Sequence, residues 1–202
     1  MIYRPNLLVI GLLVLFASGC GGTNSSAVGG GGFRPTASLQ EVMNSIIDPA
    51  ADGIWESFST TVTRKGVEEK KPESEEDWKA VRHHALALVE ASNLLLIAGR
   101  PVAAPGAKLD DEGTPGINTA EDIAKAIHVD GVGFAAAVHG LHQAAVATLA
   151  AVDARDVASI MRAGAHLDQA CEACHSRYWY PNLKGPSTKP FDRRVGKEAV
   201  RQ

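Results

Sequence analysis

The 202-residue chain contains only three cysteines and no second cysteine pair. A structural zinc site of the four-cysteine kind is therefore excluded. No basic run interleaved with aromatic residues occurs, so nothing in the sequence indicates nucleic acid as a partner. The apolar stretch of residues 7–17 would be about 17 Å long as a helix, which is short for a hydrocarbon core of ~30 Å. No internal repeat is visible.

The first nineteen residues are typical of an export signal. Arg4 precedes the apolar stretch, and small residues lead up to Cys20. Small residues before a cysteine resemble a bacterial lipobox, in which the cysteine is lipidated. We therefore predict a signal peptide at 1–19, a lipid on Cys20, and a periplasmic protein anchored to a membrane. Ordinary signal cleavage near the same point, which would release a soluble periplasmic protein, remains the alternative.

The remaining chain divides into three parts. Residues 20–37 are rich in glycine and serine and predict a flexible tether. Residues 38–182 suit a single domain. Residues 183–202 are basic and polar, and we expect a loose tail. Without the signal the chain has nineteen basic and twenty-three acidic side chains, a formal charge of −4.

Apolar residues recur at three- and four-residue steps in four stretches, which predicts four amphipathic helices. We place them at residues 38–58, 74–99, 119–149 and 153–181. Residues 60–71 are polar and charged and predict a solvated connection. The fold class expected from this pattern is all-α, with no strand.

Particular residues predict where these helices bend or end. Pro49 predicts a kink, or a restart with Asp48 as the cap. Ser74 opens a capping box for the second helix, and Asp153 is expected to cap the fourth. Glycines at 131 and 133 weaken the third helix enough to break it. Prolines and glycines in residues 102–118 predict a long surface loop.

The most informative motif is Cys171-Glu172-Ala173-Cys174-His175. In a Cys-x-x-Cys-His sequence each thiol can add to a vinyl group of haem, and the histidine can ligate the iron. On a helix, the two cysteines and the histidine project from one face. A disulfide redox pair needs no histidine here and usually accompanies a βαβ pattern, which the sequence lacks. A zinc site would need a further ligand at metal spacing.

Four amphipathic helices with this motif near the end of the last one resemble the cytochrome c′ family of class II c-type cytochromes. The similarity covers about residues 38–181, and Tyr178 matches the aromatic position three places after the histidine. Trp179 departs from the family, which usually has a basic residue there. Class I cytochromes c match less well, because no methionine follows His175.

The resemblance implies an antiparallel, left-handed four-helix bundle with one covalent haem c per chain near the end of the fourth helix. His175 would be the proximal iron ligand. Family members often pair as homodimers through their first two helices, although the sequence reveals no interface. We expect four residues to pack around the haem: Ile46, Ile47, Leu167 and Tyr178.

The sixth iron ligand decides the mechanism. Met43 lies in the apolar face of the first helix, and it matches the methionine ligand of the low-spin cytochrome c556-like branch by location. A methionine there can also be core filler. Histidines offer other ligands, of which His84 is the best placed, whereas those at 83, 128, 139, 142 and 166 are expected to be solvated or hydrogen-bonded.

Two functions follow from these alternatives. With Met43 on the iron, the protein is a one-electron carrier that serves redox partner proteins not visible in the sequence. With Met43 only packed, the iron is five-coordinate and binds nitric oxide or carbon monoxide. A peroxidase-like enzyme needs a polar acid/base pair, and the neighbours of Met43 are apolar, so we expect no enzymatic activity.

Overall fold

The computed structural model describes residues 32–183, apart from the side chains of residues 60–63. Over this range the chain is mostly helical with almost no strand, so the predicted predominance of helix is confirmed. Three predicted features fall outside the described residues: the signal peptide, the lipidation site Cys20, and the tail beyond Leu183. Most of the predicted tether lies outside them as well.

The first helical segment is continuous over residues 39–57. It consists of α1 (Leu39–Val42), a π-helical stretch η1 (Met43–Ile47) and α2 (Asp48–Ser57). The amide of Asp48 donates to the carbonyl of Met43, five residues back, so this turn is wider than an α-helical one. Pro49 follows directly; it has no amide hydrogen, and its ring would crowd the carbonyl of an ordinary turn. The wider turn accommodates Pro49, and Asp48 keeps α-helical angles rather than capping a new helix.

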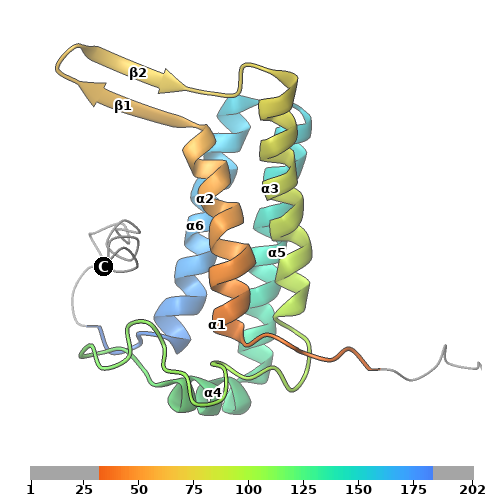
Figure 1. The fold of residues 1–202 in the computed structure, drawn as a ribbon, viewed down its shortest axis with the longest axis vertical. Helices are drawn as coiled ribbons and strands as arrows, with labels where there is room; N and C mark the ends of the chain where they lie inside the picture. Colours follow the sequence, from red (N-terminus) through yellow and green to blue (C-terminus); the bar gives the residue numbers. More distant parts are fainter. Residues whose placement is uncertain (1–31, 184–202) are drawn as a thin grey trace, which may run out of the picture. The chain divides into compact units, whose positions relative to one another are not determined.

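Residues 59–70 form a β-hairpin, so the predicted absence of strands is wrong. β1 (Ser59–Thr63) pairs antiparallel with β2 (Gly66–Lys70), with Thr63 opposite Gly66. Four successive β-branched residues in β1 favour extended backbone, and Gly66 has φ 136°, which other residues rarely adopt. The hairpin projects from the helix ends and β2 is exposed, so no apolar alternation marked it in the sequence (Figure 1).

α3 (Glu75–Leu94) begins with the predicted capping box. The amide of Asp77 donates to the Ser74 hydroxyl at 3.1 Å, and the Ser74 amide donates to the Asp77 carboxylate at 2.9 Å. Because both amides lack partners within the helix, this exchange stabilises its first turn. The predicted buried stripe is confirmed for five of its residues: Val81, Ala85, Leu88, Ser92 and Leu95.

The predicted third helix is divided at Asp130 into α4 (Ala120–Val129) and α5 (Gly131–Asp153). Asp130 has φ −120° and ψ 47°, outside the helical region, and its carboxylate accepts from the amide of Gly133 at 3.2 Å. Asp130 is therefore the N-cap of α5. The break predicted from the two glycines is confirmed, and α4 crosses the lower end of the helices (Figure 1).

α6 (Val157–Tyr178) begins later than predicted. Asp153 is the last residue of α5, and the N-cap of α6 is Asp156, whose carboxylate accepts from the amide of Ser159 at 3.1 Å. Between the two helices Arg155 adopts φ 52°, and this left-handed residue lets the chain reverse. Val157, an apolar residue of the predicted fourth helix, is 37% exposed, because it stands next to this reversal.

Four long segments enclose the core: residues 39–57, α3, α5 and α6 (Figure 1). Each runs opposite to its neighbour in the chain, and α5 packs against both α3 and α6. The indole nitrogen of Trp55 donates to the carbonyl of Gly164 at 3.4 Å and joins α2 to α6. Within the described residues, α5 alone is long and apolar enough to suit a membrane span by length and composition.

The loop before α4 is hydrogen-bonded to the lower ends of two helices, α1 and α6. The amides of Leu39 and Gln40, at the start of α1, donate to the carbonyls of Pro101 and Val102. At the end of α6, the side-chain amide of Asn118 donates to the carbonyl of Tyr178 at 2.9 Å. Val102 and Leu109 are buried, so this segment is part of the packed structure rather than only a surface loop.

Candidate functional site

Cys171, Cys174 and His175 lie in the last two turns of α6. All three are half-buried, whereas Ala173 between them is exposed. Neither thiol is part of a disulfide. The three- and four-residue spacing therefore places two sulfurs and an imidazole on the inner face of one helix.

Met43 shares a cavity with this motif. Residues of the first helical segment, α5 and α6 line the cavity together with Leu95: Met43, Ile47, Asp48, Leu95, Ala137, Val138, Leu141, Ala170, Cys171, Cys174 and His175. The described lining is apolar except for Asp48, His175 and the thiols. The fold therefore brings the predicted sixth ligand to the same space as the two thiols and the predicted proximal ligand, although 128 residues separate Met43 from Cys171.

The Cys174 thiol is protonated near neutral pH. Burial raises the pKa of Cys174 to about 11, because an apolar environment disfavours the thiolate. A disulfide-exchange cysteine needs a lowered thiol pKa, since the thiolate is the nucleophile. The direction of this shift disfavours a redox-active dithiol at Cys171 and Cys174.

The imidazole of His175 lies among aromatic rings. The Trp179 ring is centred 6.0 Å from it and the Tyr180 ring 6.2 Å, both inclined to the imidazole plane. The Tyr180 hydroxyl donates to the Glu172 carboxylate at 2.5 Å, and burial is the larger of the causes that raise the pKa of Tyr180. Trp179, which departs from the cytochrome c′ pattern, thus packs beside the predicted ligand.

Tyr178 anchors the end of α6 to the start of α5. Its hydroxyl donates to the Asp130 carboxylate at 2.7 Å, and its ring meets the Phe134 ring edge-on at 5.7 Å. Arg177 pairs with the same carboxylate at 2.5 Å. Burial, reinforced by the bond to Asp130, raises the pKa of Tyr178 to about 12. Tyr178 and Cys174 belong to one apolar cluster, so the tyrosine packs close to the motif.

Of the three other residues predicted to pack around the haem, one lines the cavity and two do not. Ile47 lines the cavity. Ile46, directly before Ile47 in the helix, is 36% exposed, because adjacent helical positions point in different directions and Ile46 faces away from the cavity. Leu167 is fully buried in the core but lies one turn above Cys171 and outside the described lining.

The remaining candidate ligands lie elsewhere. Met161 is 52% exposed on α6. The ring of His84 packs against Gly53 of α2, and His142 contacts the hydroxyl of Ser92 at 2.9 Å. The described residues contain no group of three or more histidine, cysteine or acidic side chains that could hold a metal ion.

Sequence reasoning did not place Asp48, Leu95 or the α5 residues in the site. No local pattern in the sequence marks these residues as cavity lining, because α3, α5 and α6 come together only in the folded chain. Pro49 carried a partial signal: a proline inside an apolar periodic stretch requires an altered turn, and π-helical turns occur often at functional sites.

The donors in this cavity are the kind that a covalently attached haem requires. Cys171 and Cys174 could form its two thioethers, and His175 and Met43 could be its axial ligands.

No protein-family model matches the chain, and neither curated proteins nor solved structures include a significant match.

Proposed function

We propose that the protein is a c-type cytochrome that transfers single electrons. One observation carries the proposal: Met43 of the first helix lines the same cavity as Cys171, Cys174 and His175. The chemistry that this set suits is covalent haem attachment with a nitrogen and a sulfur ligand on the iron. The apolar walls would keep water away from the iron.

In this proposal the residues of the chain attach the haem covalently and ligate its iron. The thiols of Cys171 and Cys174 form thioether bonds to one haem c, and the His175 imidazole is the proximal ligand. The rings of Trp179 and Tyr180 restrict the orientation of that imidazole. Bound haem would supply one-electron chemistry, and ligation by the Met43 thioether would raise the reduction potential and exclude other ligands.

The proposed fold is the antiparallel, left-handed four-helix bundle of the cytochrome c′ type. Its support is the alternating direction of the four long segments and the position of the motif at the end of the last one. With it we propose export to the bacterial periplasm and anchoring through a lipid on Cys20. The electrons would pass to and from periplasmic redox proteins, and the chain would act through the haem without catalysing a reaction of its own.

Haem attachment is tested first. The protein is produced in a host that exports and matures c-type cytochromes, and a denaturing gel is stained for haem. We expect a stained band and the added mass of one haem per chain. A colourless product without that mass would refute the proposal.

The sixth ligand is tested by optical titration of the ferrous protein with carbon monoxide. With Met43 on the iron, the wild-type spectrum is low-spin and does not change with carbon monoxide. Met43→Ala gives a high-spin spectrum that responds to the gas, while Met161→Ala, which removes the exposed methionine of α6, leaves the wild-type spectrum. A wild-type protein that binds carbon monoxide readily would instead indicate the five-coordinate, gas-binding function.

A further inference from the structure

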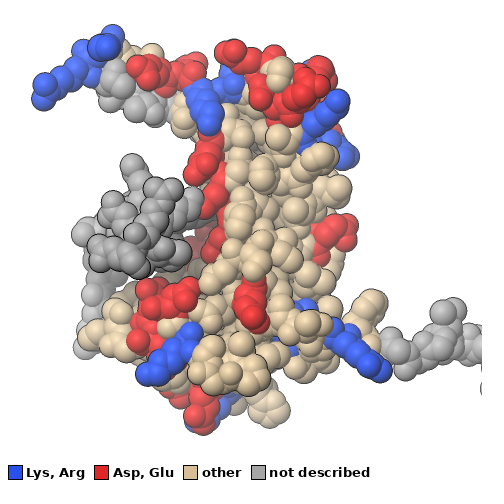
Figure 2. Space-filling model, viewed as in Figure 1, with Lys and Arg blue, Asp and Glu red and all other residues tan. Residues whose placement is uncertain are grey.

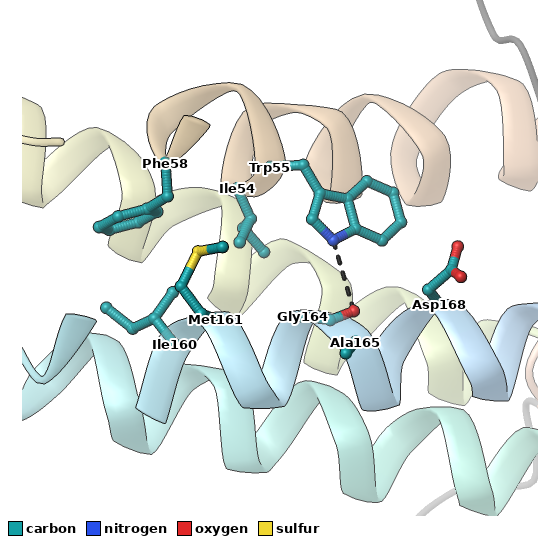
Figure 3. Close-up of a pocket in the computed structure, with 8 residues that line it drawn as sticks. All are labelled: Ile54, Trp55, Phe58, Ile160, Met161, Gly164, Ala165 and Asp168. Carbon is teal, nitrogen blue, oxygen red and sulfur yellow. Dashed lines mark hydrogen bonds between the residues drawn. The ribbon is translucent and has the colours of Figure 1, made fainter. Parts of the chain in front are cut away.

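A groove between α2 and α6 lies above the candidate haem site. It is lined by eight residues, mostly apolar, and encloses about 360 Å³: Ile54, Trp55, Phe58, Ile160, Met161, Gly164, Ala165 and Asp168 (Figure 3). The Trp55 indole reaches from α2 to the Gly164 carbonyl of α6, and Asp168 lies on α6 beyond this hydrogen bond. The groove therefore combines an apolar floor with a carboxylate at its edge.

Acidic side chains line this face of the first helical segment. Asp48, Asp52 and Glu56 are spaced by four residues and so lie along one side of the helix. Asp48 faces α6, because it lines the cavity that contains Cys171. Residues 39–57 contain no lysine or arginine, and Figure 2 shows acidic side chains in a column along this edge.

α6 adds acidic side chains from the opposite side. Asp168 and Glu172 are four residues apart, and no lysine or arginine lies between Arg162 and Arg177. Together with Asp48, Asp52 and Glu56, five carboxylates lie on the two helical segments that form the α2–α6 seam. A segment that binds along this seam should therefore be basic and should carry an apolar group for the groove.

Residues 184–202 of the same chain have this composition. They contain six basic and two acidic side chains, a net charge of +4, and one aromatic residue, Phe191. Arg193 and Arg194 follow the aromatic residue closely. Such a segment cannot form a core alone, so a binding surface on the domain would supply the apolar contacts that it lacks.

The length of the chain allows the contact. The last described residue, Leu183, packs against Gly116 beyond the end of α6. Gly164 lies fourteen residues before Tyr178, about 21 Å along the helix. Phe191 follows Leu183 by eight residues, which span up to about 26 Å when extended. The aromatic ring can therefore reach the groove while the basic residues lie beside the carboxylates.

We propose that residues 184–202 bind in cis along the α2–α6 seam, with the Phe191 ring in the groove and the basic residues against the five carboxylates. The bound segment covers the side of the molecule next to the candidate haem site, since Asp48 belongs to both. This proposal does not depend on haem.

Zero-length carbodiimide coupling of the full-length protein, read by mass spectrometry, tests this contact. The reagent joins a lysine amine to a carboxylate that it touches. We expect Lys184, Lys189 or Lys197 to couple to Asp52, Glu56 or Asp168. Coupling mainly to the acidic residues at the start of α3, or no coupling of these lysines, would overturn the proposal.

Two variants separate the apolar and the ionic contributions. Phe191→Ala should lower the ratio of bound to free segment about tenfold, as expected for loss of a buried aromatic ring, whereas Val200→Ala should leave it nearly unchanged. The triple variant D52N/E56Q/D168N should lower the coupling at the two remaining carboxylates, Asp48 and Glu172, and weaken its dependence on salt. Equal coupling in the Phe191→Ala and Val200→Ala proteins would contradict the assignment of the ring to the groove.

A mixture of isotope-labelled and unlabelled protein distinguishes cis from trans binding. Within one chain, every coupled pair carries a single isotope composition. Pairs that combine labelled and unlabelled peptides in proportion to the mixture would show that the segment binds a second copy, and would overturn the proposal.

Discussion

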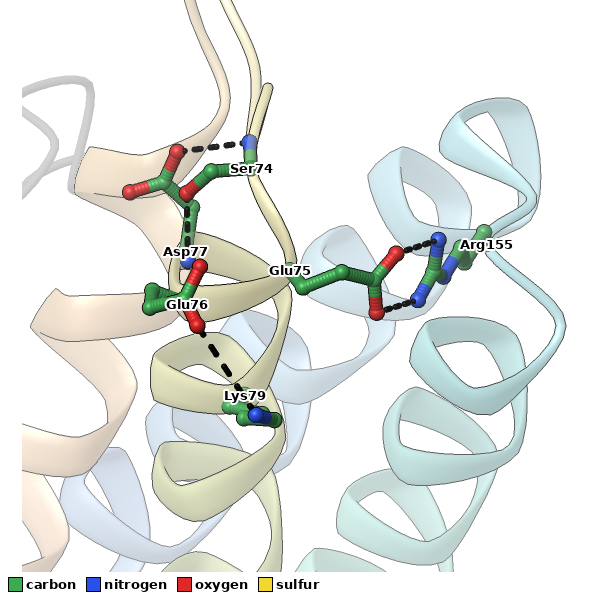
Figure 4. A network of polar contacts seen from close by, with 6 residues as sticks. All are labelled: Ser74, Glu75, Glu76, Asp77, Lys79 and Arg155. Atoms are coloured by element: carbon green, nitrogen blue, oxygen red, sulfur yellow. Dashed lines mark hydrogen bonds and ion pairs between the residues drawn. The ribbon is translucent and has the colours of Figure 1, made fainter.

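The two ends of the long helices are built in different ways. At the upper end, α3 and α6 start with ordinary caps, and the exposed Glu75–Arg155 pair, at 2.5 Å, links the start of α3 to the α5–α6 turn (Figure 4). At the lower end, the π-helical turn lines the cavity that holds Met43 and the thiols, and the helix break at Asp130 and the long loop before α4 lie at the same end. The π-helical turn and the helix break both lie at the lower end.

This difference indicates where the backbone departs from the regular helix that the local sequence favours. Exposed ion pairs contribute little to stability, so the upper end depends on helix propensity and core packing. The lower end has buried polar contacts, with Ser38 1% exposed and Tyr178 4% exposed. Irregular backbone that is held by buried contacts is typical of functional sites. If the lower end is the functional one, variants there should have larger effects than matched variants at the upper end.

The largest effect is expected from the thiols of the lower end. The double variant C171A/C174A should lose covalent haem completely, since neither thioether can form. A denaturing gel stained for haem measures this loss. The matched control is Cys20→Ala, which removes the third thiol of the chain and should keep the stain. Haem stain that survives in the double variant would contradict the assignment of the motif.

The next largest effect compares the two capping boxes. Ser38 at the lower end exchanges hydrogen bonds with Glu41, of which the shortest is 2.7 Å, and is buried; Ser74 at the upper end makes the same exchange with Asp77 but is exposed. We expect Ser38→Ala to lower the free energy of unfolding by about 2 kcal/mol and Ser74→Ala by about 1 kcal/mol. Denaturant unfolding of both variants measures the difference. Equal losses would show that burial of the lower cap adds nothing.

A smaller effect is expected from two glycines inside helices. A Cβ on Gly53 would stand 2.5 Å from the Nε2 atom of His84, whereas Gly140 on α5 has open space around it. Gly140→Ala should therefore stabilise the protein by about 0.5–1 kcal/mol through helix propensity, and Gly53→Ala should give no such gain, because the imidazole must move. Thermal unfolding of the two variants checks this steric explanation. The double variant G53A/H84A, which lacks the imidazole, should regain the stability expected from helix propensity.

The smallest effect is a dependence of stability on pH. The hydrogen bond from Tyr178 is the main cause that lowers the pKa of Asp130. The stability contributed by Asp130 is present above its ordinary pKa of ~3.9 and is lost as the pH falls through the lowered value. The pKa of Tyr178 is raised to about 12, so its contribution is present below ~10 and is lost as the pH rises through about 12.

Thermal unfolding across the pH range separates these groups. Tyr178→Phe should reduce the alkaline loss between about pH 10 and 12 and weaken the acid dependence that Asp130 provides. Glu75→Gln is the comparison at the upper end. The hydrogen bond from Arg155 lowers the pKa of Glu75, but this pair is exposed and screened by salt, so the variant should change the acid limb least. A larger change in Glu75→Gln than in Tyr178→Phe would reverse the ranking of the two ends.

Local signals predicted the regular parts of the chain well. The stripe from Val81 to Leu95 and the box at Ser74 depend on spacing within one helix, and both occur as predicted. The hairpin was missed, because its two strands carry no apolar alternation and β2 is exposed. The cap at Asp153 was misplaced by three residues, because the left-handed Arg155 extends the turn. Both errors occur where the apolar periodicity of the sequence carries no information: in an exposed hairpin and at a turn with an unusual backbone angle.

The sequence by itself determined the helical class, the break near Gly131 and the presence of two thiols and an imidazole on one helical face, because these depend on neighbours within a few residues. The tertiary structure alone decided that Met43 and Asp48 line the cavity with that face, that Ile46 does not, and that an apolar groove lies between α2 and α6. The reason is geometric: a helix of 3.6 residues per turn specifies which side chains share a face, whereas the packing of separate helices decides which faces meet.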